Sequence, residues 1–312
     1  MRGEGSLGDS ILSTPCYRGI KQANPQIKLT VACFGTSYEF LKDNPYIDEI
    51  FKLPVKTRIR HHQRWPSLIW AGLQLRCKHF DLILDTCTRI TWNWKLCKWL
   101  AGGNRVLDCF TSPVELEPSK QHACEYEASV LKHLGVENPT TDCDIPIPSI
   151  NRQRVGDWLN QHQIDNYILL NPTGSVEARC FSKQTIADLC EQLKPFGLPL
   201  VVPSMPSQET RWKAVFKHYP QATVITTPNV RDLFEVIRRA TFVITPDTSV
   251  VHAACGLKKI TLAFYNLLYP HYSPGYSRAI AIQTAPESVN GIDWTKVTQA
   301  LAQIKQWLAE TH

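Results

Sequence analysis

Runs of strand-forming residues alternate with helical stretches along the chain, and this alternation limits the folds open to it. In the first half, we expect strands at 29–34, 49–53, 80–85 and 105–110 and helices at 10–22, 64–77, 91–101 and 120–134. Such alternation is typical of a parallel sheet that is covered by helices on both faces. The first half is therefore predicted to be a doubly wound α/β domain.

A proline-rich stretch, 138–148, interrupts the pattern, and the alternation then starts again. After a helix at 152–161, we expect strands at 167–170, 198–202, 223–226, 241–245, 260–264 and 279–282 and a closing amphipathic helix at 294–308. Proline-rich segments commonly join domains. We therefore predict two doubly wound domains, residues 1–145 and 146–312.

The composition fits this division. The 312 residues suit two domains of about 150, and the hydrophobic fraction of 43% and charged fraction of 20% are typical of a soluble globular protein. The eleven cysteines are scattered without a C-x-x-C pair, so we expect reduced thiols and no zinc site. Neither a membrane-spanning apolar run nor a signal peptide is evident, and we expect a cytoplasmic protein.

The strand expected at 241–245 runs directly into a helix through Pro246-Asp247-Thr248-Ser249. Asp247 or Thr248 would cap this helix, and the free N–H groups of its first turn would point outward at the positive end of the helix dipole. Such a turn suits an anion, typically phosphate, and His252 lies about one turn further in. An ordinary capped helix is the alternative interpretation.

A second loop in the same half has the composition of a phosphate site. It follows the strand at 167–170, and its small residues allow the backbone to approach a phosphate whose charge Arg179 or Lys183 would offset. The contacts expected from the loop itself are Thr173, Gly174 and Ser175. Two anion-holding loops in one domain indicate a diphosphate.

The N-terminal segment 3–8 formally contains G-x-G-x-x-G, which would suit a dinucleotide. That motif needs a preceding strand and an acidic residue about twenty positions later, and neither is evident. An NAD-dependent oxidoreductase is therefore only an alternative. Asp9 follows the loop at the start of a helix, where it is either a plain N-cap or a candidate general base.

Basic residues are concentrated between positions 52 and 78, where seven lysines or arginines occur, and no acidic residue lies from 51 to 80. A phosphorylated or carboxylated substrate would suit this segment, because arginine pairs bidentately with such groups. The candidates are Arg58, Arg60, His61, His62 and Arg64. A solvated basic loop is the alternative, and nucleic acid is not expected because no recognised binding module is present.

The segment 91–100 contains three tryptophans and two lysines. Its spacing predicts a helix that turns Trp92, Leu96, Trp99 and Leu100 toward the core. A membrane-surface role is the alternative, because tryptophan and lysine suit the interface.

These motifs together resemble glycosyltransferase family 9, the heptosyltransferases that build the inner core of bacterial lipopolysaccharide. The likeness covers nearly the whole chain and is carried by Leu7-Gly8-Asp9, the Asn-Pro-Tyr-Ile-Asp-Glu-Ile stretch at 44–50, the 171–175 loop and the 247–252 element. The resemblance implies an α/β, GT-B architecture: two Rossmann-like doubly wound domains facing across a cleft. It places the acceptor on the N-terminal domain and the nucleotide sugar on the C-terminal domain.

The resemblance also implies an inverting transfer that needs neither metal nor cofactor. The donor would be an ADP-sugar carrying a heptose or a related sugar, and the acceptor an acidic, lipid-linked inner-core oligosaccharide of lipopolysaccharide or lipooligosaccharide. Peripheral contact with the cytoplasmic face of the inner membrane would follow. A non-catalytic nucleotide-binding protein is the second alternative.

In family terms, Asp9 is expected to be the general base and Asp247 to hold the donor sugar. Thr248, Ser249 and His252 are expected to hold the donor phosphates, and Arg179 is expected to contact the leaving diphosphate. Three departures stand out: Ser249 replaces a usual glycine, Pro203-Ser204-Met205-Pro206 replaces a common Gly-Gly-Pro, and the first strand is not seen before Leu7. Glu209 is accordingly a provisional nucleotide contact, and we expect either a sheet that lacks a strand or a truncated start.

Overall fold

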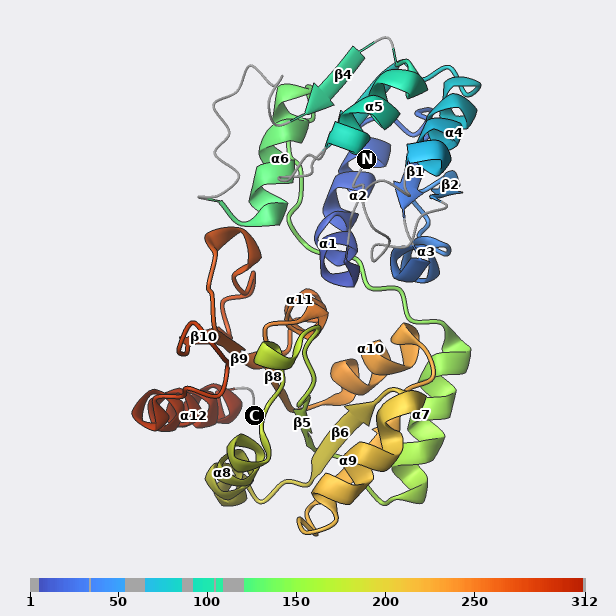
Figure 1. Ribbon diagram of the computed structural model, residues 1–312. Coiled ribbons are helices and arrows are strands. Elements are labelled where there is room, and N and C mark those ends of the chain that lie inside the picture. The colour runs from blue at the N-terminus through green and yellow to red at the C-terminus, as the bar shows by residue number, and fades with distance from the viewer. Residues whose placement is uncertain are drawn as a thin grey trace. The chain divides into compact units, whose positions relative to one another are not determined.

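The computed structural model describes residues 6–33, 35–53, 65–85, 92–103, 105–108 and 121–310 (Figure 1). The chain divides into two compact units, Met1–Cys143 and Asp144–His312. Among the helices described, none is long and apolar enough to cross a membrane.

The first unit alternates helices and strands in the predicted order. Its elements are α1 (Leu7–Leu12), α2 (Thr14–Ala23), β1 (Thr30–Cys33), α3 (Gly35–Leu41), β2 (Glu49–Lys52), α4 (Trp65–Arg76), β3 (Leu82–Asp85), α5 (Trp92–Ala101), β4 (Arg105–Asp108) and α6 (Ala123–His133). In the part that the structure describes, the strands form two parallel pairs, β1 with β2 and β3 with β4.

Two details of this unit differ from the prediction. The helix expected at 10–22 is two helices that meet at Ser13, and Pro15 occupies the first turn of α2, where a missing N–H costs nothing. Helix α3 was not predicted, because its short sequence carries little periodicity.

The second unit contains all six predicted strands. Its elements are α7 (Ser149–Gln161), β5 (Ile168–Leu170), α8 (Lys183–Leu193), β6 (Leu200–Ser204), α9 (Glu209–Phe216), β7 (Ala222–Thr226), α10 (Val230–Arg239), β8 (Phe242–Pro246), α11 (Ser249–Gly256), β9 (Ile260–Tyr265), β10 (Ala279–Gln283) and α12 (Trp294–Ala309). All strands pair in parallel in one sheet, in the order β10-β9-β8-β5-β6-β7.

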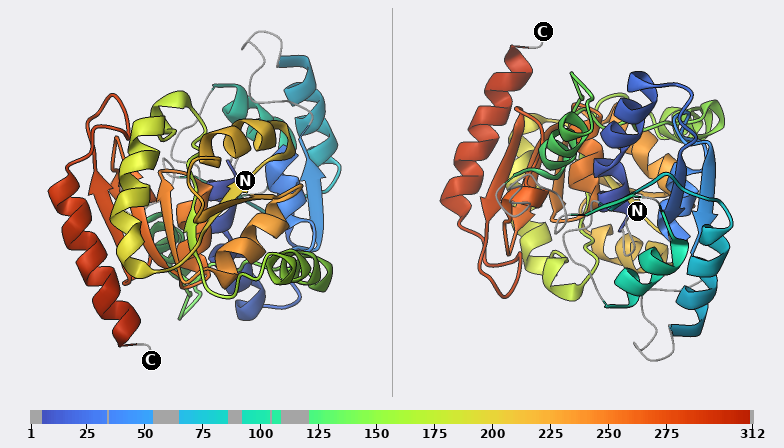
Figure 2. Two further views of the ribbon diagram at one scale, coloured as in Figure 1. Left: turned by 90° about the horizontal axis from the view of Figure 1, so that it is seen from below. Right: turned by 90° about the horizontal axis from the view of Figure 1, so that it is seen from above.

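Helices lie on both faces of this sheet (Figure 2). Side chains alternate between the two faces of a strand, so Ile168 and Leu170 of β5 point the same way and pack with side chains of α8, α9 and α12. On β9, Ala263 and Tyr265 contact Val251 and other side chains of α11. Because both faces are covered, the central strands β5, β8 and β9 are buried along their full length, which fits their largely apolar sequences.

The strand order reverses direction between β5 and β8. From β5 the chain moves outward through β6 to β7, then returns to β8 and moves outward on the other side through β9 to β10. In open α/β sheets, the crevice beyond the carboxyl ends of the strands at such a reversal is where ligands bind. A ligand site is therefore expected at the loops that follow β5 and β8.

Candidate functional site

The carboxyl ends of β5 and β8 lie side by side and are joined by Asn171. Its backbone N–H donates to the Ile244 carbonyl (2.9 Å), and its side-chain Nδ2 donates to Thr245 Oγ1 (2.9 Å) and to the Thr173 carbonyl (3.1 Å). Asn171 is buried, so these bonds are not in competition with bulk water. They bring together the two loops that the sequence predicts as anion sites.

The loop after β5 folds tightly on itself at Gly174. A Cβ atom at this position would collide with the carbonyl oxygen and Cβ of Arg179. The Gly174 N–H donates to Cys180 Sγ (3.3 Å), and the Phe181 N–H donates to the Pro172 carbonyl (2.9 Å). Glycine is thus required here for a close backbone approach that holds Arg179 against the loop.

Arg179 crosses to the loop after β8 and pairs with Asp247. The distance from Arg179 Nη1 to Asp247 Oδ2 is 3.0 Å. Burial raises the pKa of the Asp247 carboxyl above its ordinary value, and the nearby Arg179 charge opposes that rise. The Asp247 N–H donates to the Phe264 carbonyl (2.8 Å), which fixes the residue at the end of the sheet.

Helix α11 is capped by Thr248, one of the two caps that the sequence allowed. Thr248 Oγ1 accepts from the Val250 N–H (3.2 Å), and the Thr248 carbonyl accepts from the Val251 N–H (3.1 Å). The cap itself therefore takes these two N–H groups, and the expectation that the free N–H groups of the first turn point outward concerns the others. Beside Arg179, the half-buried residues Thr248 and Ser249 offer two hydroxyl groups and the start of a helix to an anion.

His252 lies one turn into α11, as expected, and is buried. Its ring centroid is 6.3 Å from that of Tyr272, which also packs edge-on against His271 (4.8 Å). The carbonyl of Tyr272 accepts from the Tyr265 hydroxyl (3.0 Å). Sequence reasoning missed this aromatic layer, whose signal is the Tyr269-Pro270-His271-Tyr272 run shortly after β9.

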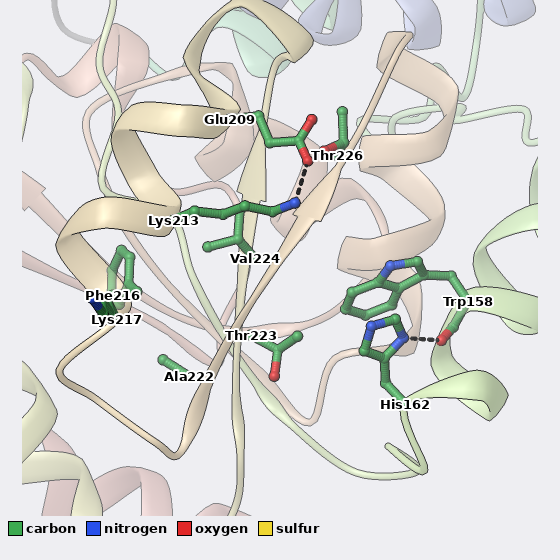
Figure 3. Close-up of a pocket in the computed structure, with 10 residues that line it drawn as sticks. All are labelled: Trp158, His162, Glu209, Lys213, Phe216, Lys217, Ala222, Thr223, Val224 and Thr226. Atoms are coloured by element: carbon green, nitrogen blue, oxygen red, sulfur yellow. Dashed lines mark hydrogen bonds and ion pairs between the residues drawn. The ribbon is translucent and has the colours of Figure 1, made fainter.

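Lys183 and Glu209 line two other grooves of the second unit. Lys183 begins α8 and lines a groove of about 320 Å³ with Arg211 and Trp212. Glu209 begins α9 and lines a groove of about 340 Å³ along the edge strand β7 (Figure 3). Glu209 pairs with Lys213 (2.6 Å), and this bond, with a second from Thr226, lowers its pKa. The groove thus presents a carboxylate that is already held by a lysine.

Asp9 occupies the third position of α1 in a capping box. Its Oδ2 accepts from the Ser6 N–H (2.8 Å) and from Ser6 Oγ (3.0 Å), while its own N–H donates back to Ser6 Oγ (3.4 Å). Ser6, not Asp9, is therefore the N-cap residue. The half-buried Asp9 carboxylate is held in a defined orientation at the start of the helix.

Comparison with known proteins shows which family the chain matches. The sequence model of Glycosyltransferase family 9 (heptosyltransferase) matches residues 104–299, which is more than half of the chain. The chain belongs to glycosyltransferase family 9. This confirms the resemblance read from the motifs and favours a glycosyltransferase over the oxidoreductase alternative.

Named relatives agree with this family 9 membership. A putative lipopolysaccharide heptosyltransferase 4 of Escherichia coli (strain K12) is 23% identical over 325 residues, which cover 96% of this chain and 84% of the relative. A solved glycosyltransferase family 9 structure from Veillonella parvula DSM 2008 has a TM-score of 0.81 at 19% identity and covers 99% and 97% of the two chains.

A third comparison concerns a solved heptosyltransferase structure. The E. coli heptosyltransferase WaaC with ADP-2-deoxy-2-fluoro heptose has a TM-score of 0.72 at 19% identity, with 100% of both chains covered. At this identity the likeness shows the fold, and it confirms the predicted α/β fold of the GT-B heptosyltransferases.

The basic acceptor candidates of this family 9 enzyme are not part of the described structure. Arg58, Arg60, His61, His62 and Arg64 all fall within 54–64, outside the described residues. Their role stays a prediction from the sequence.

Proposed function

We propose that this enzyme transfers a heptose, or a related sugar, from an ADP-sugar to an acidic inner-core acceptor of lipopolysaccharide or lipooligosaccharide, with inversion and without a metal. One observation carries the proposal most directly: Arg179, Asp247 and the Thr248 helix cap meet where the strand order of the second unit reverses. A solved relative of the same fold is named for its complex with ADP-2-deoxy-2-fluoro heptose.

In this proposal, the second unit holds the donor. Arg179, the hydroxyls of Thr248 and Ser249, and His252 contact the diphosphate, with Thr173, Gly174 and Ser175 along its other side. Asp247 accepts a hydrogen bond from a sugar hydroxyl. The diphosphate gains negative charge as it leaves, so a guanidinium and hydroxyl groups fixed in advance stabilise the transition state more than the ground state.

Lys183 and Glu209 have more peripheral roles in this scheme. The Glu209 carboxylate contacts the nucleoside at one end of its groove, and its ion pair with Lys213 loosens when the nucleoside binds. Lys183, at the first position of α8, contributes positive charge near the loop that it follows rather than a direct contact.

The first unit supplies the acceptor and the base in this proposal. Asp9 removes the proton from an acceptor hydroxyl, whose oxygen then attacks the anomeric carbon on the face opposite the departing ADP. The bond to the acceptor forms as the bond to the diphosphate breaks, which inverts the configuration. Arg58, Arg60, His61, His62 and Arg64 pair with phosphates or carboxylates of the acceptor.

Two measurements on the intact chain test this function. Thermal unfolding is followed with ADP-, UDP- and GDP-sugars, and we expect the largest rise in Tm with the ADP-sugar, since a ligand stabilises the fold that binds it. Turnover is then measured with ADP-heptose and a deacylated inner-core acceptor. A larger shift with a UDP-sugar would overturn the donor assignment, and a shift without turnover would favour a non-catalytic nucleotide-binding protein.

A further inference from the structure

The outward face of α4 is apolar. Ile69 is 36% exposed, Trp70 54% and Leu73 49%, while Ala71 and Leu75 on the opposite side are fully buried. The three exposed residues lie within one helical face, because neighbours three and four positions apart stack on each other. A helix on the surface of a protein usually turns polar residues to solvent, so a face of this kind indicates an interaction surface.

Helix α5 packs against α4 and adds to the exposed apolar area. A Cβ at Gly72 of α4 would lie 2.7 Å from Leu100 Cβ and 3.1 Å from the Cys97 carbonyl oxygen, so the two helices touch at this glycine. Figure 1 shows them beside each other in the first unit. Trp99 of α5 is 70% exposed, the highest exposed fraction among the large apolar side chains of the described residues.

A buried ion pair explains why Trp99 faces outward. Lys98 Nζ lies 2.7 Å from Asp85 Oδ2, and the two side chains are 5% and 0% exposed. This pair fixes the rotation of α5 about its axis, with Cys97 and Ala101 buried against the core. The expectation that Trp99 would face the core was therefore wrong, and Leu96 and Leu100 are only partly covered.

The charge of this helix pair is of one sign. Neither α4 nor α5 contains an acidic residue, while Arg76, Lys95 and Lys98 are all basic. Arg76 and Lys95 are exposed. A second copy of the chain seated on this face would bring like charges together, whereas an anionic partner would not.

We propose that the outward face of α4, together with Trp99 of α5, binds a membrane surface that carries anionic phospholipids. Tryptophan and leucine side chains would enter the boundary between headgroups and acyl chains, and the exposed cations would pair with headgroup phosphates. The proposal does not depend on the sugar transferred. It adds to the proposed function by holding the enzyme where a lipid-linked acceptor lies.

The test is sedimentation of the full chain with phospholipid vesicles. Binding is measured with vesicles of phosphatidylcholine alone and with vesicles that also contain phosphatidylglycerol. We expect binding to the anionic vesicles that weakens with salt, and a loss of about tenfold or more for Trp70→Ser with Leu73→Ser, since burial of large apolar side chains drives this kind of binding. Trp99→Ser is a second, independent variant.

Ile150→Ser is the matched control, because Ile150 is 63% exposed but lies on α7 of the second unit. It should leave vesicle binding unchanged. All variants should keep the wild-type Tm and the turnover with a deacylated, soluble acceptor, which separates this proposal from the proposed function. Equal binding by wild type and both α4–α5 variants would overturn it, as would a dimer in solution that Trp70→Ser with Leu73→Ser dissociates.

Discussion

Arg179 is paired with Asp247 across the reversal point of the six-stranded sheet, with Arg179 Nη1 3.0 Å from Asp247 Oδ2. The two residues come from different loops, 68 positions apart in the sequence, and they meet because β5 and β8 are neighbours in the sheet. In the proposed reaction, the same guanidinium serves the leaving diphosphate. In this proposal, Asp247 holds Arg179 close to the diphosphate.

Replacement of Arg179 tests this relationship. We expect Arg179→Gln to lower kcat by about 10²–10³, because the loss of one group that stabilises developing charge typically costs this much. The donor should also bind less tightly. Steady-state kinetics with ADP-heptose give kcat, and isothermal titration gives the dissociation constant. Arg211→Gln is the control, since Arg211 is exposed and lines a different groove. Equal losses in both variants would contradict a specific role for Arg179.

Asp247 gives a prediction about pH. Burial raises the pKa of its carboxyl in the folded state, against the opposing effect of Arg179. Relative to the unfolded chain, the folded protein therefore favours the neutral carboxyl more, and the stability from this group is present at low pH and lost as pH rises through the raised pKa. Asp247→Asn removes this titration and keeps the shape. We expect the Tm of the variant, relative to wild type, to rise as pH rises from acid to neutral.

Thermal unfolding over that pH range measures the effect. Asp293→Asn serves as the control, because Asp293 is an exposed N-cap of α12. A Tm difference for Asp247→Asn that stays constant with pH would show that the carboxyl is not titrating in the expected direction.

Local patterns were sufficient to predict the strands of both units. Each strand is a short apolar run that ends in small or turn-forming residues, and such signals lie within a few positions of one another. The loops after β5 and β8 were found in the same way. Their meeting point depends on strand order, which no local pattern contains, so the contact of Arg179 with Asp247 could not be predicted.

The prediction of which face of α5 is buried was wrong for the same reason. The apolar residues of α5 follow a helical period that favours a buried Trp99. The helix instead buries Lys98, whose charge is paired with that of Asp85 from β3. A pattern within the helix cannot show that a buried carboxylate from another element pairs with the lysine. Tyr272 and His252, whose ring centroids lie 6.3 Å apart, also come from different segments of the chain.

The Lys98–Asp85 pair leads to a prediction about stability. Lys98→Met should leave Asp85 buried without its cation and destabilise the protein by about 3–5 kcal/mol, the usual cost of removing one partner of a buried ion pair. The double variant Lys98→Met with Asp85→Leu removes both charges and should recover much of this loss. Urea unfolding of the full chain, followed by tryptophan fluorescence, measures the difference. If the double variant is no more stable than the single one, the pair is not the cause.

Asp9 is both the capping-box partner of Ser6 and the proposed base, and the two roles can be separated. Asp9→Asn retains an oxygen that accepts from the Ser6 N–H, so α1 should keep its start while the basic carboxylate is lost. We expect kcat to fall by about 10²–10⁴, the usual contribution of a general base. Donor binding, measured as the rise in Tm with the ADP-sugar, should persist. Ser6→Ala makes the opposite change, because it removes the capping hydroxyl and retains the carboxylate.

The two variants are expected to differ in opposite ways, Ser6→Ala mainly in stability and Asp9→Asn mainly in kcat. Ser6→Ala should cost about 1 kcal/mol of stability, the usual loss for an N-cap serine, with a smaller loss of kcat than Asp9→Asn. Asp9→Asn should change the Tm little and kcat greatly. Because Ser6 Oγ and the Ser6 N–H both donate to Asp9 Oδ2, some loss of kcat in Ser6→Ala would reflect a carboxylate that is less well oriented. Equal loss of kcat in the two variants would mean that Asp9 acts only through the helix start, and another residue would then have to take the proton.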